Sequence, residues 1–93
     1  MEVNEVFEKV KNLFVEELGI DADKVTMESW LEGDLEIDSL GIVEVIMAFE
    51  DEFSIVIDDE EIESIQVVRT VEDGKEVMDT TVQKLCDFLS SKL

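Results

Sequence analysis

The sequence predicts an all-α fold, a small four-helix bundle with a short β-hairpin inserted before the last helix. Three observations predict it. Apolar residues recur at helical spacing in several segments, β-forming residues and a turn signal gather before the last of them, and 93 residues with 45% hydrophobic content suit one small core. We therefore expect a single domain over residues 1–93.

The first predicted helix runs from Val3 to Leu18. Asn4 is a candidate start signal, and Gly19 stands where a helix C-terminus favours glycine. The apolar stripe of this helix consists of Val3, Val6, Phe7, Val10, Leu13, Phe14 and Leu18.

Residues 20–37 follow no sustained period and contain Gly33, so we expect a long loop. Its large apolar residues are expected to pin it to the core: Val25, Trp30, Leu31 and Leu35.

The second predicted helix, Ser39 to Phe53, is apolar on two sides. One arc suits the core and holds Ile42, Val45, Ile46, Phe49 and Phe53. The other arc has an apolar centre and an acidic rim, which is typical of a binding face. Its centre is Leu40, Val43 and Met47, and its rim is Glu44, Glu50 and Asp51. The alternative is that the short third helix covers this second arc.

A short acidic third helix is expected over Asp59 to Ser64, and the last helix from about Thr80 to Ser91. Thr80 and Gln83 form a candidate capping box. Between these helices, residues 65–78 are rich in β-formers and contain the hairpin-turn signal Asp73-Gly74. A two-stranded hairpin alone is marginally stable, so it would have to lean on the helices.

The charge balance is strongly acidic. Twenty-six acidic residues face seven basic ones, a formal net charge of −19, and no Lys or Arg occurs between Val25 and Val68. Such a field repels nucleic acids and anionic membranes and attracts basic protein surfaces. We expect no nucleic-acid and no membrane partner. The central acidic stretch is either a docking surface for basic partners or simply a solvated surface.

The composition also excludes several kinds of chemistry. Histidine is absent, which removes His-based catalysis and His metal ligation. The one cysteine, Cys86, cannot form an internal disulfide, and its place on the apolar stripe of the last helix predicts a buried thiol. With no long apolar run and no secretory leader pattern, a cytoplasmic setting is expected.

A calcium loop is the metal site that so acidic a chain suggests. Asp21, Asp23 and Glu32 occupy its first, third and twelfth positions. Val25 and Thr26, however, replace a required oxygen ligand and the glycine that makes the turn. We expect no metal site.

Ser39 stands at the predicted start of the second helix. Serine is a favoured N-cap, which by itself marks only a helix boundary. A helix N-terminus also favours a phosphate ester, because its unpaired N–H groups and dipole attract negative charge. By spacing alone, capping is the stronger interpretation.

The sequence around Ser39 resembles the acyl carrier protein family. The similarity rests on DLEIDSL at Asp34–Leu40, MAFEDEF at Met47–Phe53 and IVIDDEE at Ile55–Glu61. It extends over residues 30–65, and the first and last helices fit the family in pattern.

The resemblance implies a four-helix bundle of acyl carrier type with phosphopantetheine on Ser39, flanked by Asp38 and Leu40. A phosphopantetheinyl transferase would donate the arm from coenzyme A. The arm's thiol would carry acyl groups as thioesters, so the chain would be a monomeric carrier and not an enzyme. Acyl-transferring and acyl-processing enzymes with basic surfaces would contact Asp38, Leu40, Val43, Glu44, Met47, Glu50 and Asp51. An interior acyl pocket would be lined by Ile46, Ile57 and Ile65.

Four features depart from the family pattern. Gly41 replaces a common acidic residue, Ile42 replaces a frequent small polar one, Asp58 replaces the usual proline, and residues 65–78 form a longer connection. They favour a specialised carrier, with cargo from fatty acid or lipid synthesis or from a specialised acyl or polyketide pathway. The competing hypothesis is an acidic mimic of nucleic acid, which would need neither Ser39 nor a second apolar arc.

Overall fold

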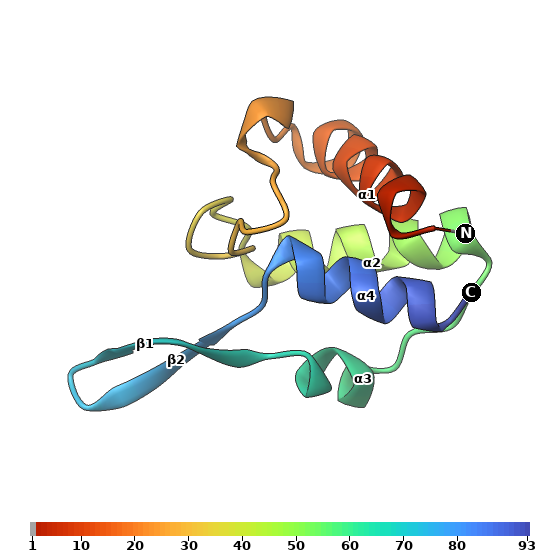
Figure 1. Cartoon of the computed structure of the whole chain (residues 1–93). Helices are drawn as coiled ribbons and strands as arrows, with labels where there is room; N and C mark the ends of the chain where they lie inside the picture. The colour runs from red at the N-terminus through yellow and green to blue at the C-terminus, as the bar shows by residue number, and fades with distance from the viewer. Residues whose placement is uncertain (1) are drawn as a thin grey trace.

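A computed structural model describes residues 2–93 (Figure 1). The helices are α1 (Val3–Leu18), η1 (Ala22–Lys24, a 3₁₀ turn), α2 (Ser39–Phe53), α3 (Asp59–Ser64) and α4 (Val82–Ser91), and the strands are β1 (Val67–Glu72) and β2 (Lys75–Asp79). The predicted helical bundle with a hairpin before its last helix is confirmed. None of the described helices is both long and apolar enough to cross a membrane.

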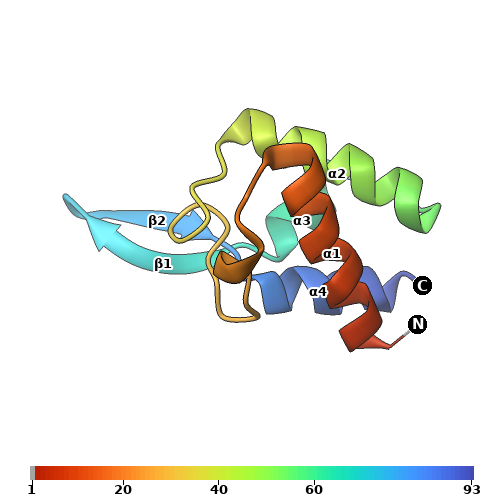
Figure 2. The same ribbon diagram turned by 90° about the horizontal axis from the view of Figure 1, so that it is seen from above.

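The core lies between α1, α2 and α4, with α1 packed against each of the other two helices (Figure 2). The rings of Phe14 and Phe49 meet at its centre, with 6.0 Å between their centroids. In Figure 1, α3 lies on the side of α2 and α4 opposite α1. The side chains with no exposed surface are Val6, Val10, Phe14, Phe49, Val82, Cys86 and Leu89.

Two predicted capping residues are wrong, although the predicted bounds of α1 are confirmed. Glu2, not Asn4, is the N-cap of α1. Thr81, not Thr80, caps α4, with its Oγ1 accepting a hydrogen bond from the Lys84 N–H at 3.2 Å. The reason for the second shift is that the Thr80 carbonyl accepts a bond from the Leu31 N–H at 3.0 Å, which keeps Thr80 outside the helix. The predicted C-cap Gly19 is confirmed, with φ at +66°.

The long loop of residues 20–37 is fastened to the start of α4. Val25, Leu31 and Leu35 are buried in the core as predicted. Trp30 is only half-buried and is not part of that core. Its backbone instead forms an isolated antiparallel bridge with Thr81. The loop that leads into α2 is thus attached to the beginning of α4.

The hairpin projects from the end of the bundle where α2 begins, opposite the end where α4 finishes (Figures 1 and 2). Its register runs from Val67 opposite Asp79 to Glu72 opposite Lys75, with an irregularity between Val68 and Thr70. The expectation that it leans on the helices needs correction. Its firmest attachment is to the long loop, through the buried Asp79 at the end of β2.

Asp79 joins four groups from three segments. Its carboxylate accepts hydrogen bonds from the backbone N–H of Glu32 at 3.2 Å and of Gly33 at 3.0 Å. It also accepts from the Thr80 N–H at 2.8 Å and from Arg69 Nη1 at 2.7 Å. A buried carboxylate is stable only when paired in this way. The hairpin base therefore has a fixed position against the loop.

Candidate functional site

Ser39 is the first residue of α2, and its side chain is exposed. The N-cap is Asp38, whose Oδ1 accepts a hydrogen bond from the Gly41 N–H at 2.7 Å. The capping interpretation of Ser39 is therefore wrong. Within residues 2–93, no side-chain hydrogen bond of the Ser39 hydroxyl is found. A free hydroxyl at a helix N-terminus is well placed for a phosphate ester.

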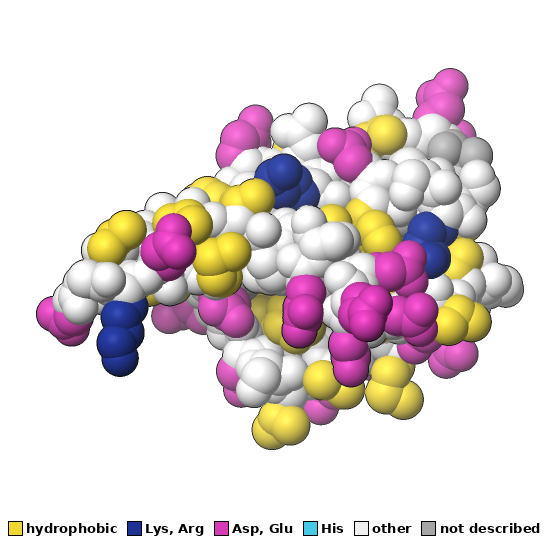
Figure 3. Space-filling view, turned by 90° about the horizontal axis from the view of Figure 1, so that it is seen from below, with side chains coloured by type: hydrophobic (Ala, Val, Ile, Leu, Met, Phe, Trp, Pro, Cys, Tyr) yellow, Lys and Arg dark blue, Asp and Glu magenta, His cyan; other side chains and the backbone are white. Residues whose placement is uncertain are grey.

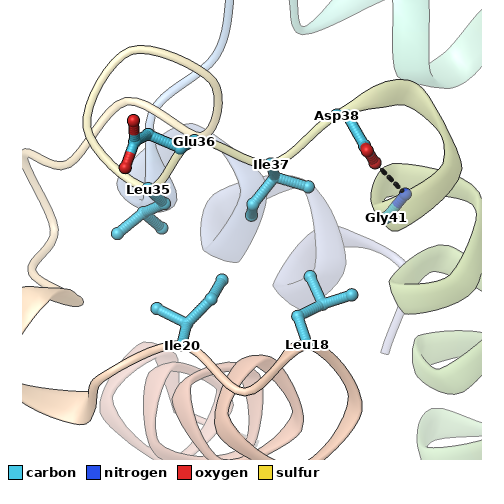
Figure 4. A pocket seen from close by; sticks show the side chains of 7 residues that line it. All are labelled: Leu18, Ile20, Leu35, Glu36, Ile37, Asp38 and Gly41. Carbon is cyan, nitrogen blue, oxygen red and sulfur yellow. Dashed lines mark hydrogen bonds between the residues drawn. The ribbon is translucent and has the colours of Figure 1, made fainter.

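Gly41 is buried beneath this helix start. A Cβ there would lie 3.0 Å from Ile37 Cγ2 and 3.3 Å from Asp38 Oδ1. A larger side chain at this position would therefore collide with its neighbours. Because Gly41 is buried, its lack of a charged side chain does not interrupt the exposed acidic surface of α2. Beside it is a hollow of about 220 Å³ lined by Leu18, Ile20, Leu35, Glu36, Ile37, Asp38 and Gly41 (Figure 4).

The second apolar arc of α2 is open to solvent. Leu40 is 73% exposed, Val43 57% and Met47 60%. The alternative that α3 covers these side chains is therefore wrong. Seen from below, acidic side chains gather on the side where α3 lies, and hydrophobic side chains protrude along the lower edge (Figure 3). This exposed arc combines apolar contact with negative charge.

The three predicted rim acids differ in their surroundings. Glu44 and Asp51 are exposed. Glu50 is half-buried, and its carboxylate accepts a hydrogen bond from the Ile57 N–H at 3.0 Å. Glu50 therefore also fixes the connection between α2 and α3, whereas the other two carboxylates are free to meet a partner.

Two grooves run along α2 on the side of α3. The Ser39 groove, of about 550 Å³, reaches from Ser39 to the hairpin base and is lined by Leu31, Glu32, Ser39, Ile42, Val43, Ile62, Glu63, Gln66, Asp79 and Thr80. The Met47 groove, of about 430 Å³, is lined by Ile42, Val43, Ile46, Met47, Glu50, Ile57, Asp59, Ile62 and Glu63. The shared residues Ile42, Val43, Ile62 and Glu63 make the two grooves neighbours.

A small inner cavity of about 20 Å³ lies behind the Ser39 groove. Ile46 and Ile65 line this cavity, and Ile46 and Ile57 line the Met47 groove, so the three predicted pocket residues border adjoining spaces. Five residues line both the inner cavity and the Ser39 groove: Leu31, Ile42, Ile62, Gln66 and Thr80. Ser39 thus lines a groove whose inner wall is shared with a cavity inside the bundle.

Sequence reasoning missed several residues of this hollow, among them Thr80, Gln66 and Asp79. The signal available for Asp79 was the hairpin itself. An Arg and an Asp on opposite strands of a predicted hairpin form a candidate cross-strand pair. No period or motif in the sequence marks Thr80 as a groove residue, because its placement depends on the loop that pairs with it.

Two ionisable side chains, Glu61 on α3 and Cys86 in the core, have shifted pKa values. A hydrogen bond from Lys92 and another from the Asp58 N–H lower the pKa of Glu61, and the first of these ties α3 to the end of α4. Burial, assisted by the nearby Asp87, raises the pKa of Cys86 to about 12. The predicted buried thiol is confirmed, and at neutral pH it stays protonated and unreactive.

Metal ligands are not gathered at this site. Among residues 2–93, no group of three or more His, Cys, Asp or Glu side chains is arranged to hold a metal ion. Asp21 instead caps η1, accepting a hydrogen bond from the Asp23 N–H at 3.1 Å.

Comparison with known proteins places the site in context. Residues 8–73 match the family model described as a phosphopantetheine attachment site. The chain is 47% identical over 68 residues to an acyl carrier protein of Petrotoga mobilis, covering 73% of this chain and 80% of the relative. It is 53% identical over 66 residues to one of Clostridium acetobutylicum, covering 71% and 86%, and 50% identical over 64 residues to one of a Picosynechococcus species, covering 69% and 79%.

Proposed function

The chain belongs to the acyl carrier protein family, with phosphopantetheine as its cofactor, and we propose that Ser39 is the residue that carries the arm. The observation that carries the proposal is that the Ser39 hydroxyl at the start of α2 is exposed and does not cap the helix. The other serines of the matched region are less suited. Ser29 is buried, Ser54 ends α2, and the Ser64 hydroxyl donates to the Glu61 carbonyl at 2.6 Å.

The arm, when bound, supplies a thiol that carries the acyl group as a thioester. The chain's own part is to present that arm, not to act as an enzyme. Asp38 holds the first turn of α2 in place, and the positive end of the helix dipole there favours a negatively charged ester on Ser39. Tethering raises the local concentration of the cargo at each partner enzyme.

We assign partner contact to the exposed arc of α2. Asp38, Leu40, Val43, Glu44, Met47 and Asp51 are all exposed there, with Glu50 half-buried beside them. The partners would be a phosphopantetheinyl transferase and acyl-transferring or acyl-processing enzymes with basic surfaces. A formal net charge of −19 speeds encounters with basic protein surfaces and disfavours binding to nucleic acids and anionic membranes.

We assign shelter of the acyl chain to the hollow between α2 and α3. Support comes from the lining that the Ser39 groove shares with the inner cavity, and from the predicted pocket residues Ile46, Ile57 and Ile65 around it. An apolar chain gains free energy by leaving water for such a lining.

We propose that the protein is a monomeric carrier, that residues 1–93 form one domain, and that it works in the cytoplasm. Its cargo comes from fatty acid or lipid synthesis or from a specialised acyl or polyketide pathway. The hairpin and Gly41 favour specialised partners.

A thiol count tests the attachment. The chain is treated with coenzyme A and a broad-specificity phosphopantetheinyl transferase, then with a maleimide under native conditions. Because Cys86 is buried with a raised pKa, only the arm should react, giving one label per chain. Ser39→Ala should give none, while the control Ser54→Ala keeps its label. Labelling of the Ser39→Ala chain to the same extent would refute the assignment.

A further inference from the structure

Thr80 presents a buried hydroxyl without a hydrogen-bond partner. The residue is 2% exposed, and its Oγ1 has no partner among the described residues. Both of its backbone groups are occupied, because its N–H donates to Asp79 Oδ1 at 2.8 Å and its carbonyl accepts from the Leu31 N–H at 3.0 Å. The backbone of Thr80 is therefore fixed at both groups, whereas its side-chain hydroxyl forms no hydrogen bond with the described residues.

This hydroxyl belongs to a residue that lines both the inner cavity and the Ser39 groove. Gln66, which carries a side-chain amide, also lines both spaces. The rest of the inner lining is apolar: Leu31, Ile42, Val45, Ile46, Phe49, Ile62, Ile65 and Leu85. The inner cavity thus has two polar residues, Thr80 and Gln66, in an otherwise apolar lining.

The least buried wall of the hollow is α3. It has six residues, none of them fully buried, and it packs on the core through the single apolar side chain of Ile62, so displacing it exposes the apolar surface of one side chain. A cavity of about 20 Å³ holds roughly one water molecule. A longer guest therefore requires α3 to shift outward, and a guest that offers an oxygen to Thr80 gains a hydrogen bond that a hydrocarbon chain lacks.

We propose that Thr80, with Gln66, forms a polar subsite that favours tethered acyl chains bearing a hydroxyl or keto oxygen over saturated chains. The proposal rests on the proposed carrier function. It names the class of cargo: partly processed acyl intermediates that still hold an oxygen substituent. An amide of the arm itself offers the Thr80 hydroxyl a hydrogen bond as well. The experiment therefore separates the arm from the cargo as the partner of this hydroxyl.

The test compares melting temperatures of five forms: unmodified, arm only, octanoyl, 3-hydroxyoctanoyl and 3-oxooctanoyl. Mass spectrometry first verifies each form, so that failure to load counts against the carrier function and not against the subsite alone. In the unaltered chain, the oxygenated cargoes should melt about 4 °C above octanoyl, as expected for one added hydrogen bond in a domain of this size. Thr80→Val, which keeps the shape, should abolish the difference, and Thr80→Ser should retain it.

Ser90→Ala is the matched control, since Ser90 Oγ is also buried without a partner but borders neither groove nor cavity. It should leave the cargo preference intact. Two results would overturn the proposal. If Thr80→Val changes the arm-only form as much as the oxygenated forms, the hydroxyl serves the arm. If Thr80→Val lowers the melting temperature of every form equally, a buried water already satisfies the hydroxyl.

Discussion

Asp38 caps α2 by accepting a hydrogen bond from the Gly41 N–H at 2.7 Å, which leaves the adjacent Ser39 without a capping role. In this protein the cap and the proposed attachment residue are thus neighbours and not the same residue. The division lets the hydroxyl be modified without weakening the helix that presents it.

Substitution separates these two roles. Asp38→Ala should lower the free energy of unfolding by about 1 kcal/mol, the usual cost of losing an N-cap. Ser39→Ala should change it by less than about 0.5 kcal/mol, as for other exposed positions. Urea unfolding followed by circular dichroism measures both. Equal destabilisation by the two substitutions would show that Ser39 contributes to the cap after all.

The exposed arc of α2 should control the rate of arm transfer. Reversing Glu44 and Asp51 to Lys should lower kcat/KM of the transferase about tenfold at low salt, because the acidic rim steers a basic enzyme surface. The control reverses Glu72 and Glu76 on the hairpin, which changes the net charge equally. Equal losses in both double variants would indicate a net-charge effect and not a docking face.

Asp79 should dominate the stability of the hairpin base. Asp79→Ala leaves Arg69 and the N–H groups of Glu32 and Gly33 without their acceptor, so we expect a loss of about 3 kcal/mol. Glu76→Ala, at an exposed position of the same strand, should cost less than about 0.5 kcal/mol. The denaturant midpoints of the two variants measure these losses. A loss of stability in Asp79→Ala as small as that in Glu76→Ala would mean that other contacts hold the hairpin base.

The link between α3 and α4 should weaken in acid. The folded-state pKa of Glu61 is lowered by Lys92 and the Asp58 N–H, so its charged form favours folding. This stabilisation is present above the ordinary pKa of 4.5 and is lost as pH falls through the lowered value. Lys92→Gln should therefore be less stable than the parent at neutral pH, and the gap should close in acid.

Thermal unfolding across pH measures that gap, and Lys84→Gln, an exposed position on the same helix, serves as the control. A difference between Lys92→Gln and the parent that persists unchanged to the lowest pH would exclude Glu61 as its source.

Local pattern predicted most of the fold. The bounds of α1 and α2 follow from apolar periodicity, α3 was expected as a short acidic helix, and the hairpin follows from β-forming residues around Asp73-Gly74. The capping residues were predicted less well, because Asn4 and Thr80 are favoured capping types but the actual caps are Glu2, two residues before Asn4, and Thr81, one residue after Thr80. At Thr80 a long-range pairing with Leu31 decided the outcome, and no local propensity contains that information.

The site divides in the same way. The exposed arc at Leu40, Val43 and Met47 could be predicted because the helical period fixes which residues share a face. The hollow behind Ser39 could not, since its lining combines the long loop, α3 and the hairpin base. The isoleucines Ile46, Ile57 and Ile65 were named through family resemblance, not through spacing. Thr80 entered the site only through the structure.

The most direct test of the central claim is the intact mass of the chain after reaction with coenzyme A and a broad-specificity phosphopantetheinyl transferase, followed by fragmentation to locate the added group. The prediction is a gain of one phosphopantetheine, located on Ser39, in the parent and in Ser54→Ala, and no gain in Ser39→Ala. Addition at any other residue, or no addition with several transferases that modify a control carrier, would contradict it.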